Sequence, residues 1–343
     1  LSEEIKELKS LNFSTSNIYI SPNAHIVTPL HKGIDQKNEA SAKNKIGTTG
    51  KGIGPTYVDK YDRMGIRGVD LLDANSLREK LDAKLEVAIR LGHLPHDAIG
   101  QLNDKFQEFM KCAERVALLV SDTFTLIHEF ADRGENILIE GAQGTLLDVD
   151  YGTYPFVTSS SASSAGISTG LGLPTTKVET IIGILKAYTT RVGTGPFPTE
   201  LFDDNGQKFR DLGHEYGATT GRPRRCGWFD GVAGMYSARV NGLTDVALTK
   251  LDILDHFEQI QVCVAYKVDG KETRNMSEVL HRLDDVEPVY ESLEGWMSTT
   301  TGIDKFKNLP QAAQNYISHL EKLMNTEISI ISTGPGRDEI LRK

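Results

Sequence analysis

Three arginines within four residues, Arg222, Arg224 and Arg225, stand out in a chain that is acidic overall. They follow two threonines and a glycine at Thr219–Gly221. Like charges at this spacing repel one another unless anions lie between them, and the planar guanidinium group suits bidentate contacts with carboxylate and phosphate. The threonine hydroxyls and the glycine N–H would add donors without bulk. The segment therefore indicates a site for anionic ligands, with an exposed basic loop as the alternative.

Lys250, Leu251 and Asp252 directly follow an expected buried strand at Asp245–Thr249. Ligands of α/β sheets bind at the carboxyl ends of the strands. A carboxylate there can accept hydrogen bonds from guanine N1–H and the exocyclic amine, and each charge-assisted bond contributes about 1.5–3 kcal/mol. Adenine offers no such pair of donors. The pattern resembles the guanine-specificity motif of GTP-binding proteins, although a solvated turn after a strand would share it.

A second strand end carries Ser332, Thr333, Gly334 and Pro335. Small residues let backbone N–H groups approach a base or a ribose closely. The alternative is a helix N-cap at Ser332 or Thr333. Two such strand ends in one chain favour guanine recognition more than either does alone.

Two glycine-rich segments are further candidates for nucleotide contacts. Gly47–Pro55 resembles a phosphate-binding loop but is not a Walker A motif, because Lys45 stands where the first glycine belongs and Gly52 where Ser or Thr belongs. No Walker A motif occurs elsewhere in the sequence. In Glu140–Thr145 the amide of Gln143 could read a base edge by donating and accepting at once. An ordinary turn is the alternative for both segments.

Expected strands and helices alternate along the chain, which favours an α/β fold. The segments with short, β-branched strand character are Ser16–Ile20, Asn136–Glu140, Asp245–Thr249, Gln261–Tyr266 and Glu327–Ser332. A helix is expected over Ser76–Leu91, with Leu77, Leu81, Leu85 and Ala88 on its inner face and Ser76 and Glu79 as a capping box. Another helix should begin at Pro310. A longer amphipathic stretch covers Ala98–Phe130.

The composition is that of a globular protein with an acidic balance. With 38 Lys and Arg against 47 Asp and Glu, the net charge is −9, which disfavours nucleic-acid binding because that usually needs a basic face. No apolar run is long enough to span a membrane. Three cysteines without a CxxC pair, and nine histidines without metal-ligand spacing, predict neither disulfides nor zinc and suit a reducing cytoplasm. We expect one domain over residues 1–343.

Six motifs, taken together, resemble the adenylosuccinate synthetase family. They follow the family's order and span nearly the whole chain: GTTGKGIGPTYVDKYDRMGIR (Gly47–Arg67), EGAQGTLLDVDYGTYPFVTSS (Glu140–Ser160), ILKAYTTRVGTGPFPTEL (Ile184–Leu201), GATTGRPRRCGW (Gly217–Trp228), TKLD (Thr249–Asp252) and STGP (Ser332–Pro335). The resemblance implies a large central mixed or parallel sheet flanked by helices and related to P-loop nucleotide-binding proteins. It also implies a ligase that forms adenylosuccinate from IMP and L-aspartate, while GTP is hydrolysed to GDP and phosphate through 6-phosphoryl-IMP. This reaction is the first committed step from IMP to AMP.

The resemblance further implies roles for individual residues on the IMP side. Thr49 and Thr158 would hold the IMP phosphate, and Gln143 would face the hypoxanthine. Arg222 would touch the IMP ribose. Arg63 would reach the 5′-phosphate of IMP in the partner subunit of a homodimer.

The same resemblance implies the aspartate and GTP contacts. The aspartate-binding loop would comprise Ala218, Thr219, Thr220, Gly221, Arg222, Pro223 and Arg224. The GTP side would comprise Arg224, Lys250, Leu251, Asp252, Ser332, Thr333 and Gly334, in agreement with the guanine recognition inferred from the residues. Lys60 is the remaining catalytic candidate.

Two segments of the family pattern do not occur in this sequence, which opens at Leu1 inside an expected helix. One is a GDEGKGK-type loop that holds the GTP phosphates and Mg²⁺ and carries the general-base aspartate. The other is an NAGH-type segment with the general-acid histidine; Asn23-Ala24-His25 lacks its glycine, so His25 is not given that role. We therefore expect no metal ligand in this chain, Mg²⁺ bound by the absent loop, and no turnover by residues 1–343 alone. The alternative function is a non-catalytic GTP-binding remnant of the family.

Overall fold

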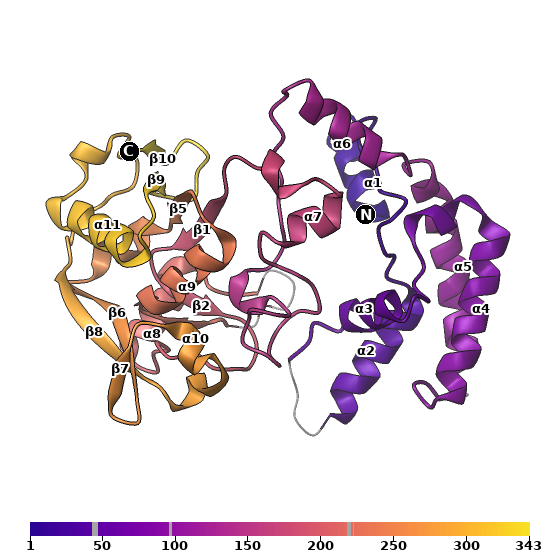
Figure 1. Cartoon of the computed structure of the whole chain (residues 1–343), viewed down its shortest axis with the longest axis horizontal. Helices are drawn as coiled ribbons and strands as arrows, with labels where there is room; N and C mark the ends of the chain where they lie inside the picture. Colours follow the sequence, from indigo (N-terminus) through magenta and orange to yellow (C-terminus); the bar gives the residue numbers. More distant parts are fainter. Residues whose placement is uncertain (43–46, 96–97, 218–220, 222) are drawn as a thin grey trace. The chain divides into compact units, whose positions relative to one another are not determined.

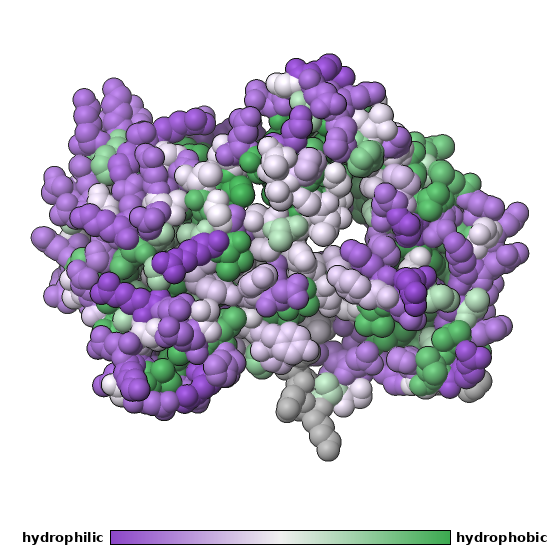
Figure 2. Space-filling view, in the orientation of Figure 1, coloured by the Kyte–Doolittle hydropathy of each residue, from purple (hydrophilic) through white to green (hydrophobic). Residues whose placement is uncertain are grey.

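The computed structural model describes residues 1–42, 47–95, 98–217, 221 and 223–343, which divide into two compact units (Figure 1). Unit 1 comprises Leu1–Glu140, Thr158–Ser160 and Ile167–Lys177, and unit 2 comprises Gly141–Val157, Ser161–Gly166 and Val178–Lys343. Hydrophilic residues predominate on the surface visible in Figure 2. Within the described residues, no helix combines the length and the apolarity that crossing a membrane requires.

The described part of unit 1 is built from helices. They are α1 (Ser2–Ser10), α2 (Pro29–Ser41), α3 (Ile53–Tyr61), η1 (Gly68–Leu72), α4 (Ala74–Arg90), α5 (Ala98–Ala117), α6 (Thr123–Asp132), most of α7 (Gly166–Leu171) and η3 (Thr175–Lys177).

Helix α4 contributes the central part of the core of unit 1. The expected inner face is confirmed, because Leu77, Leu81, Leu85 and Ala88 are all buried. The expected capping box is wrong. The helix begins at Ala74, and the Asp73 side chain accepts hydrogen bonds from the backbone N–H groups of the first turn. An aspartate at the N-cap satisfies donors that would otherwise lack partners.

The amphipathic stretch Ala98–Phe130 contains two helices, α5 and α6. Two other expectations for unit 1 differ from the structure. Ser16–Ile20 forms only an isolated parallel bridge, from Ile20 to Val120. Asn136–Glu140 is not a strand in the described structure, and its central Leu138 is 93% exposed. Strand character in a sequence yields a strand only where a neighbour supplies the ladder hydrogen bonds.

The described residues of unit 2 form two four-stranded sheets and a two-stranded ladder. The first sheet has the order β1-β5-β9-β10, with β1 (Ile182–Lys186), β5 (Asp245–Thr249) and β9 (Ile328–Ser332) parallel and β10 (Ile340–Arg342) antiparallel to β9. In the second sheet, β6 (Gln259–Val268) pairs with β4 (Phe229–Asp230), β7 (Lys271–Thr273) and β8 (Glu287–Glu294). Strands β2 (Thr189–Arg191) and β3 (Arg225–Gly227) form the ladder.

Helices and short 3-10 turns cover these sheets. They are η2 (Thr145–Leu147), α8 (Asp204–Gly213), α9 (Gly231–Asn241), η4 (Leu251–His256), α10 (Met276–Val279), η5 (Leu280–Asp285), η6 (Phe306–Asn308) and α11 (Gln311–Met324). Helix α11 begins at Gln311, one residue later than expected, with Pro310 as its N-cap, and Tyr316 on its inner face donates a hydrogen bond of 2.6 Å to Ala187 O. The expected α/β fold, a mixed sheet flanked by helices, is confirmed.

Candidate functional site

Three parallel strands of unit 2 end at the same edge of the first sheet. In the register of β1 and β5, Lys186 lies opposite Thr249, and in that of β5 and β9, Leu248 lies opposite Ile331. The expected strand end after β5 is therefore next to the expected strand end after β9. The sequence prediction that these two segments meet is supported by the register, as ligand sites in parallel sheets require.

The segment after β5 turns sharply. Lys250 has a left-handed backbone (φ 60°), and η4 begins at Leu251. The Leu251 side chain is fully buried in the core, so its backbone alone can face a ligand. The half-buried Asp252 lines a hollow of about 320 Å³, together with hydroxyl side chains of the Ser298–Thr301 segment. Burial raises the pKa of the Asp252 carboxyl, and the nearby Asp255 and Glu339 carboxylates raise it further.

The hydroxyl-lined wall of this hollow is held by a buried carboxylate. Asp255 accepts hydrogen bonds from Trp296 Nε1 (2.6 Å), Thr300 N (2.7 Å) and Thr300 Oγ1 (2.9 Å). Asp255 therefore fixes the Trp296–Thr301 loop against η4, which carries Asp252. Sequence reasoning did not single out Asp255, and its position three residues after Asp252 was the available signal.

Ser332, Thr333 and Gly334 form a tight turn between β9 and β10, and the helix N-cap alternative is wrong. Thr333 N donates a 2.9 Å hydrogen bond to Glu339 O, and Ser332 Oγ donates one of 2.7 Å to Gly334 O. A Cβ atom at Gly334 would lie 2.5 Å from the Glu339 carboxylate. A larger residue there would have to displace the Glu339 side chain.

A fully buried glutamate, Glu215, forms ion pairs with cations of three segments: the end of β1, the turn after β5 and the arginine-rich segment. Lys186 Nζ lies 2.7 Å from its Oε1, Lys250 Nζ 3.4 Å from the same oxygen, and Arg224 Nη1 2.8 Å from Oε2. The Tyr188 hydroxyl donates a further hydrogen bond of 2.6 Å to Oε1. Burial by itself would raise the pKa of Glu215, but the hydrogen bonds from Lys186 and Tyr188 and the neighbouring positive charges lower it to about 2.

The arginine-rich segment Gly217–Arg225 is described only in part. Ala218, Thr219, Thr220 and Arg222 lie outside the described residues. Tyr216 and Pro223 form an antiparallel bridge, and Gly221 N donates a 2.8 Å hydrogen bond to Gly217 O. Arg224 N donates one of the same length to Glu215 O.

The arginines at the end of this segment have carboxylate partners within the protein. Arg225 pairs with Glu200 and donates a 2.8 Å hydrogen bond to Gly195 O, while Arg224 pairs with Glu215. The inference that only anionic ligands could relieve the repulsion between the arginines was therefore incomplete. Arg224 donates one side-chain N–H to Glu215 in the described structure. The other N–H groups of its guanidinium can still donate to an anion.

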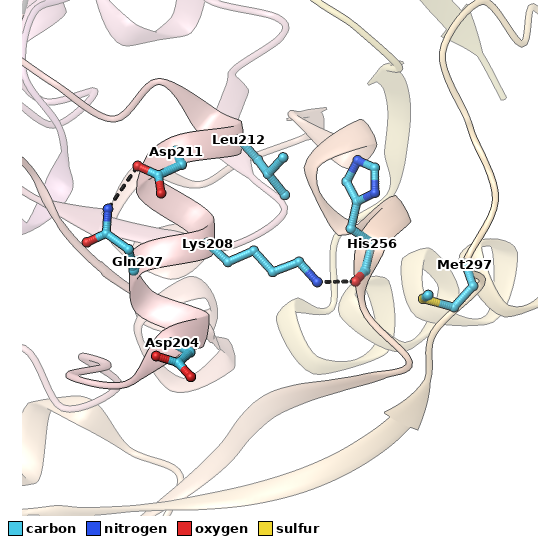
Figure 3. A pocket seen from close by; sticks show the side chains of 7 residues that line it. All are labelled: Asp204, Gln207, Lys208, Asp211, Leu212, His256 and Met297. Atoms are coloured by element: carbon cyan, nitrogen blue, oxygen red, sulfur yellow. Dashed lines mark hydrogen bonds between the residues drawn. The ribbon is translucent and has the colours of Figure 1, made fainter.

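A second hollow, of about 610 Å³, lies between α8 and η4 (Figure 3). Lys208 extends from α8 and donates a hydrogen bond to His256 O at the end of η4. Met297 lines this hollow and also the one at Asp252. Most residues that line this hollow are exposed. Lys208 connects α8 to the end of η4 through its hydrogen bond to the His256 backbone oxygen.

In unit 1, helix α3 carries Lys60 and ends just before Arg63. Asp59 fixes this helix, because it accepts a 2.8 Å hydrogen bond from His31 Nε2 of α2 and pairs with Lys84 of α4. Burial would raise the pKa of Asp59, but these two partners lower it. Lys60 Nζ lies 5.1 Å from the centre of the Tyr57 ring. Arg63 is exposed, with a left-handed backbone (φ 64°).

The glycine-rich segment before α3 donates two N–H groups to carboxylates of the protein, the first from Gly47 N to Glu39 Oε1 (2.9 Å). Gly52 N donates a 2.8 Å hydrogen bond to the buried Asp35 carboxylate, and its positive φ of 84° starts α3. Thr49, in the same segment, is exposed. Thr158 belongs to unit 1 and is half-buried, whereas Gln143 belongs to unit 2 and is exposed with a φ of 66°. Among the described residues, no group of three or more His, Cys, Asp or Glu side chains could hold a metal ion.

Parallel strands that end in Lys250, Asp252 and a glycine turn define an α/β protein of the nucleotide-binding type. The chain belongs to the adenylosuccinate synthetase family, whose model matches residues 1–341. The adenylosuccinate synthetase of Streptomyces coelicolor is 48% identical over 99% of this chain and 80% of its own length. That of Geobacter sulfurreducens is 49% identical over 94% of this chain and 75% of its own.

A solved structure agrees with these relatives. The fully ligated adenylosuccinate synthetase of Plasmodium falciparum superposes with a TM-score of 0.89 and 33% identity, covering all of this chain and 82% of that one. The expected family is confirmed. The chain is a GTP-dependent ligase of purine nucleotide synthesis, and the reaction of its family joins IMP and L-aspartate to adenylosuccinate.

Proposed function

We propose that this chain binds the guanine base of GTP at the carboxyl ends of β5 and β9, for the ligation of IMP and L-aspartate. The observation that carries the proposal is the half-buried Asp252 carboxylate, which lines a hollow of about 320 Å³ at the strand end adjoining β9. Guanine offers this carboxylate both N1–H and an exocyclic amine. Hypoxanthine offers N1–H alone, and adenine has no N1–H. Loss of one charge-assisted bond corresponds to roughly a tenfold to hundredfold loss of affinity.

The rest of the guanine site follows from the same turn. The stem of Lys250 lies along the base, and Leu251 contributes its backbone. Backbone groups of Ser332, Thr333 and Gly334 approach the base or the ribose, which a turn without bulky side chains permits.

The aspartate carboxylates are assigned to Ala218, Thr219, Thr220, Gly221, Arg222, Pro223 and Arg224. The remaining N–H donors of Arg224 support this assignment and its contact with GTP, because a guanidinium group can bind two anions at once. All three substrates are anionic, which explains why an acidic chain concentrates cations here.

The IMP contacts are assigned to Thr49, Gln143, Thr158 and Arg222. Arg63 is assigned to the IMP phosphate of a partner subunit in a homodimer. Its exposure, at the end of a helix held by a hydrogen bond from His31 and an ion pair with Lys84, supports a contact outside its own unit. Lys60 remains the catalytic candidate in the same helix.

The chemistry of the reaction explains why a nucleotide is consumed. An oxo group is a poor leaving group and phosphate is a good one, so GTP phosphorylates the 6-oxygen of IMP before the aspartate amine displaces the phosphate. The family also uses Mg²⁺. We assign its binding to the family's GDEGKGK-type loop, as the resemblance implies.

Three further assignments belong to this proposal. Residues 1–343 form one domain, in keeping with a family match that runs through both units. The location is cytoplasmic, which agrees with the unpaired cysteines. Nucleic acid and membranes are not partners. The second candidate function is a non-catalytic GTP-binding remnant of the family.

The test compares GDP, IDP and ADP binding to the unsubstituted chain and to Asp252→Asn. We expect the substitution to weaken GDP binding roughly tenfold or more. The ratio of the affinity for GDP to the affinities for IDP and ADP should also fall. Asp204→Asn, which removes an exposed carboxylate from the larger hollow, is the matched control and should change neither. An unaltered GDP preference in Asp252→Asn contradicts the guanine assignment.

A second assay separates the two candidate functions. Adenylosuccinate formation is followed by ultraviolet absorbance with IMP, GTP, aspartate and Mg²⁺, for residues 1–343 and for the same chain extended by a relative's GDEGKGK-type segment. Turnover by either form supports the ligase. GDP binding without turnover in both forms favours the remnant.

A further inference from the structure

Glu215 has no role among the ligand contacts assigned above, yet it is the meeting point of the site's cations. It is fully buried, accepts hydrogen bonds from Lys186, Tyr188 and Arg224, and pairs with Lys250 at 3.4 Å. Two of these, Arg224 and Lys250, are the cations assigned to GTP. A buried carboxylate is tolerated only when it is paired and hydrogen-bonded, and removal of one partner is strongly destabilising.

The two carboxylate oxygens divide the partners between them. Oε1 faces Lys186, Tyr188 and Lys250, at the ends of the parallel strands, while Oε2 faces Arg224, at the end of the arginine segment. One side chain therefore spans two ligand-binding segments that are 26 residues apart along the chain, from position 224 to position 250.

The backbone strengthens this link. The N–H of Arg224 donates to Glu215 O (2.8 Å), so the arginine segment closes onto Glu215 twice, through main chain and side chain. Lys250 Nζ also donates to Gly213 O at the end of α8, and Lys208 of α8 donates to His256 O at the end of η4 (Figure 3). The turn after β5, here called the guanine turn (Lys250–His256), is thus attached to α8 at both ends of the turn, and α8 leads into Glu215.

We infer that Glu215 is a positioning residue that holds Lys250 and Arg224 in the orientation that binds GTP, and so joins the guanine turn to the arginine segment. The inference rests on the proposed function for its GTP contacts. Its consequence is that a change at Glu215 disturbs the nucleotide site without removing any atom that touches nucleotide.

Glu215→Gln is the variant that tests this. The amide keeps the size of the side chain, but its NH₂ end must face either Arg224 or the two lysines, and it repels whichever cation it faces. We expect GDP carrying a fluorescent ribose label to bind roughly tenfold to a hundredfold more weakly than it binds the unsubstituted chain. Tryptic cleavage at the Arg224–Arg225 bond, quantified by mass spectrometry, should accelerate because Arg224 is released.

Asp230→Asn is the matched control. Asp230 is also buried, at 5% exposure, but its partners are the Tyr266 hydroxyl and the N-terminus of α9, without any cation of the site. Its substitution should lower stability and leave both GDP affinity and cleavage at Arg224–Arg225 unchanged. A purely structural effect of Glu215 predicts equal changes in the two variants and would overturn the inference.

The two readouts also separate this inference from the guanine assignment. Faster cleavage in Glu215→Gln, with no GDP binding by the unsubstituted chain, supports the positioning role and refutes the guanine site. Unchanged cleavage overturns the positioning role, whatever happens to GDP binding. Faster cleavage with unchanged GDP affinity overturns the link to the nucleotide.

Discussion

The buried Glu215 carboxylate should make the stability of unit 2 depend on pH in a defined direction. Burial opposes its ionisation, but Lys186, Tyr188 and Arg224 overcome that effect and lower its pKa from 4.5 to about 2. A group with a lowered folded pKa contributes stability above its unfolded pKa and loses it as the pH falls through the folded one. The window for Glu215 is therefore about pH 5 down to about pH 2.

The magnitude follows from the size of the pKa change. A difference of about 2.5 pH units, at about 1.36 kcal/mol per unit, corresponds to about 3 kcal/mol of unfolding free energy at neutral pH. The same two pKa values leave about 1 kcal/mol at pH 3. Glu215→Gln cannot titrate, so the stability gap between the unsubstituted chain and this variant should shrink by about 2 kcal/mol between pH 7 and pH 3.

Urea unfolding followed by tryptophan fluorescence is the assay. The sequence has two tryptophans, Trp228 and Trp296, both buried and both in unit 2, so their emission reports the unit that contains Glu215. Asp230→Asn serves as a comparison, because the stability contribution of Asp230 should depend on pH in the opposite direction. Burial raises the pKa of Asp230, so its contribution is present at low pH and is lost as the pH rises. A gap for Glu215→Gln that stays constant or widens on acidification contradicts the reasoning.

Two further predictions concern local structure. Asp73→Ala removes the side chain that accepts from Asn75 N and Ser76 N at the start of α4, and should lower the unfolding free energy of unit 1 by about 0.5–2 kcal/mol, measured by circular dichroism; Asn75→Ala is the control, since it leaves the cap in place. Gly213→Ala would bring a methyl group to 2.2 Å from the Tyr188 hydroxyl, so it should displace Tyr188 and accelerate tryptic cleavage at the Arg224–Arg225 bond as Glu215→Gln does. Intact thermal stability and unchanged cleavage in Gly213→Ala would count against the packing described here.

The strands that the sequence predicted most accurately are those that pair with neighbouring strands of the first sheet in unit 2. The expected strand Asp245–Thr249 matches β5 in full, and Glu327–Ser332 differs from β9 by one residue. Each has hydrogen-bonded neighbours in the first sheet. Asn136–Glu140 has equal strand character in sequence and forms no strand in the described structure. Propensity alone could not distinguish these cases, because a strand is completed by its neighbours and not by its own residues.

The candidate site was predictable to the extent that it lies at strand ends. Lys250, Asp252 and the Ser332–Gly334 turn were found because motifs with a chemical purpose directly follow apolar strands. Asp255 was not found, because a carboxylate that fixes a loop from within has no signature beyond its spacing from other residues.

Glu215 was missed for a related reason, and the reason changes how the arginine cluster is understood. From sequence, Arg224 and Arg225 were charges in need of anions, and ligands were the anions considered. The structure pairs Arg225 with Glu200 and Arg224 with Glu215, 25 and 9 residues earlier in the chain. Arg225 is thereby held among backbone carbonyls, while Arg224 keeps further donors on a guanidinium fixed at one end. A guanidinium fixed in this way loses less side-chain entropy when an anion arrives. If Arg224 binds GTP and aspartate as proposed, the internal carboxylate would therefore not compete with the ligand for this arginine but would hold it in place to bind.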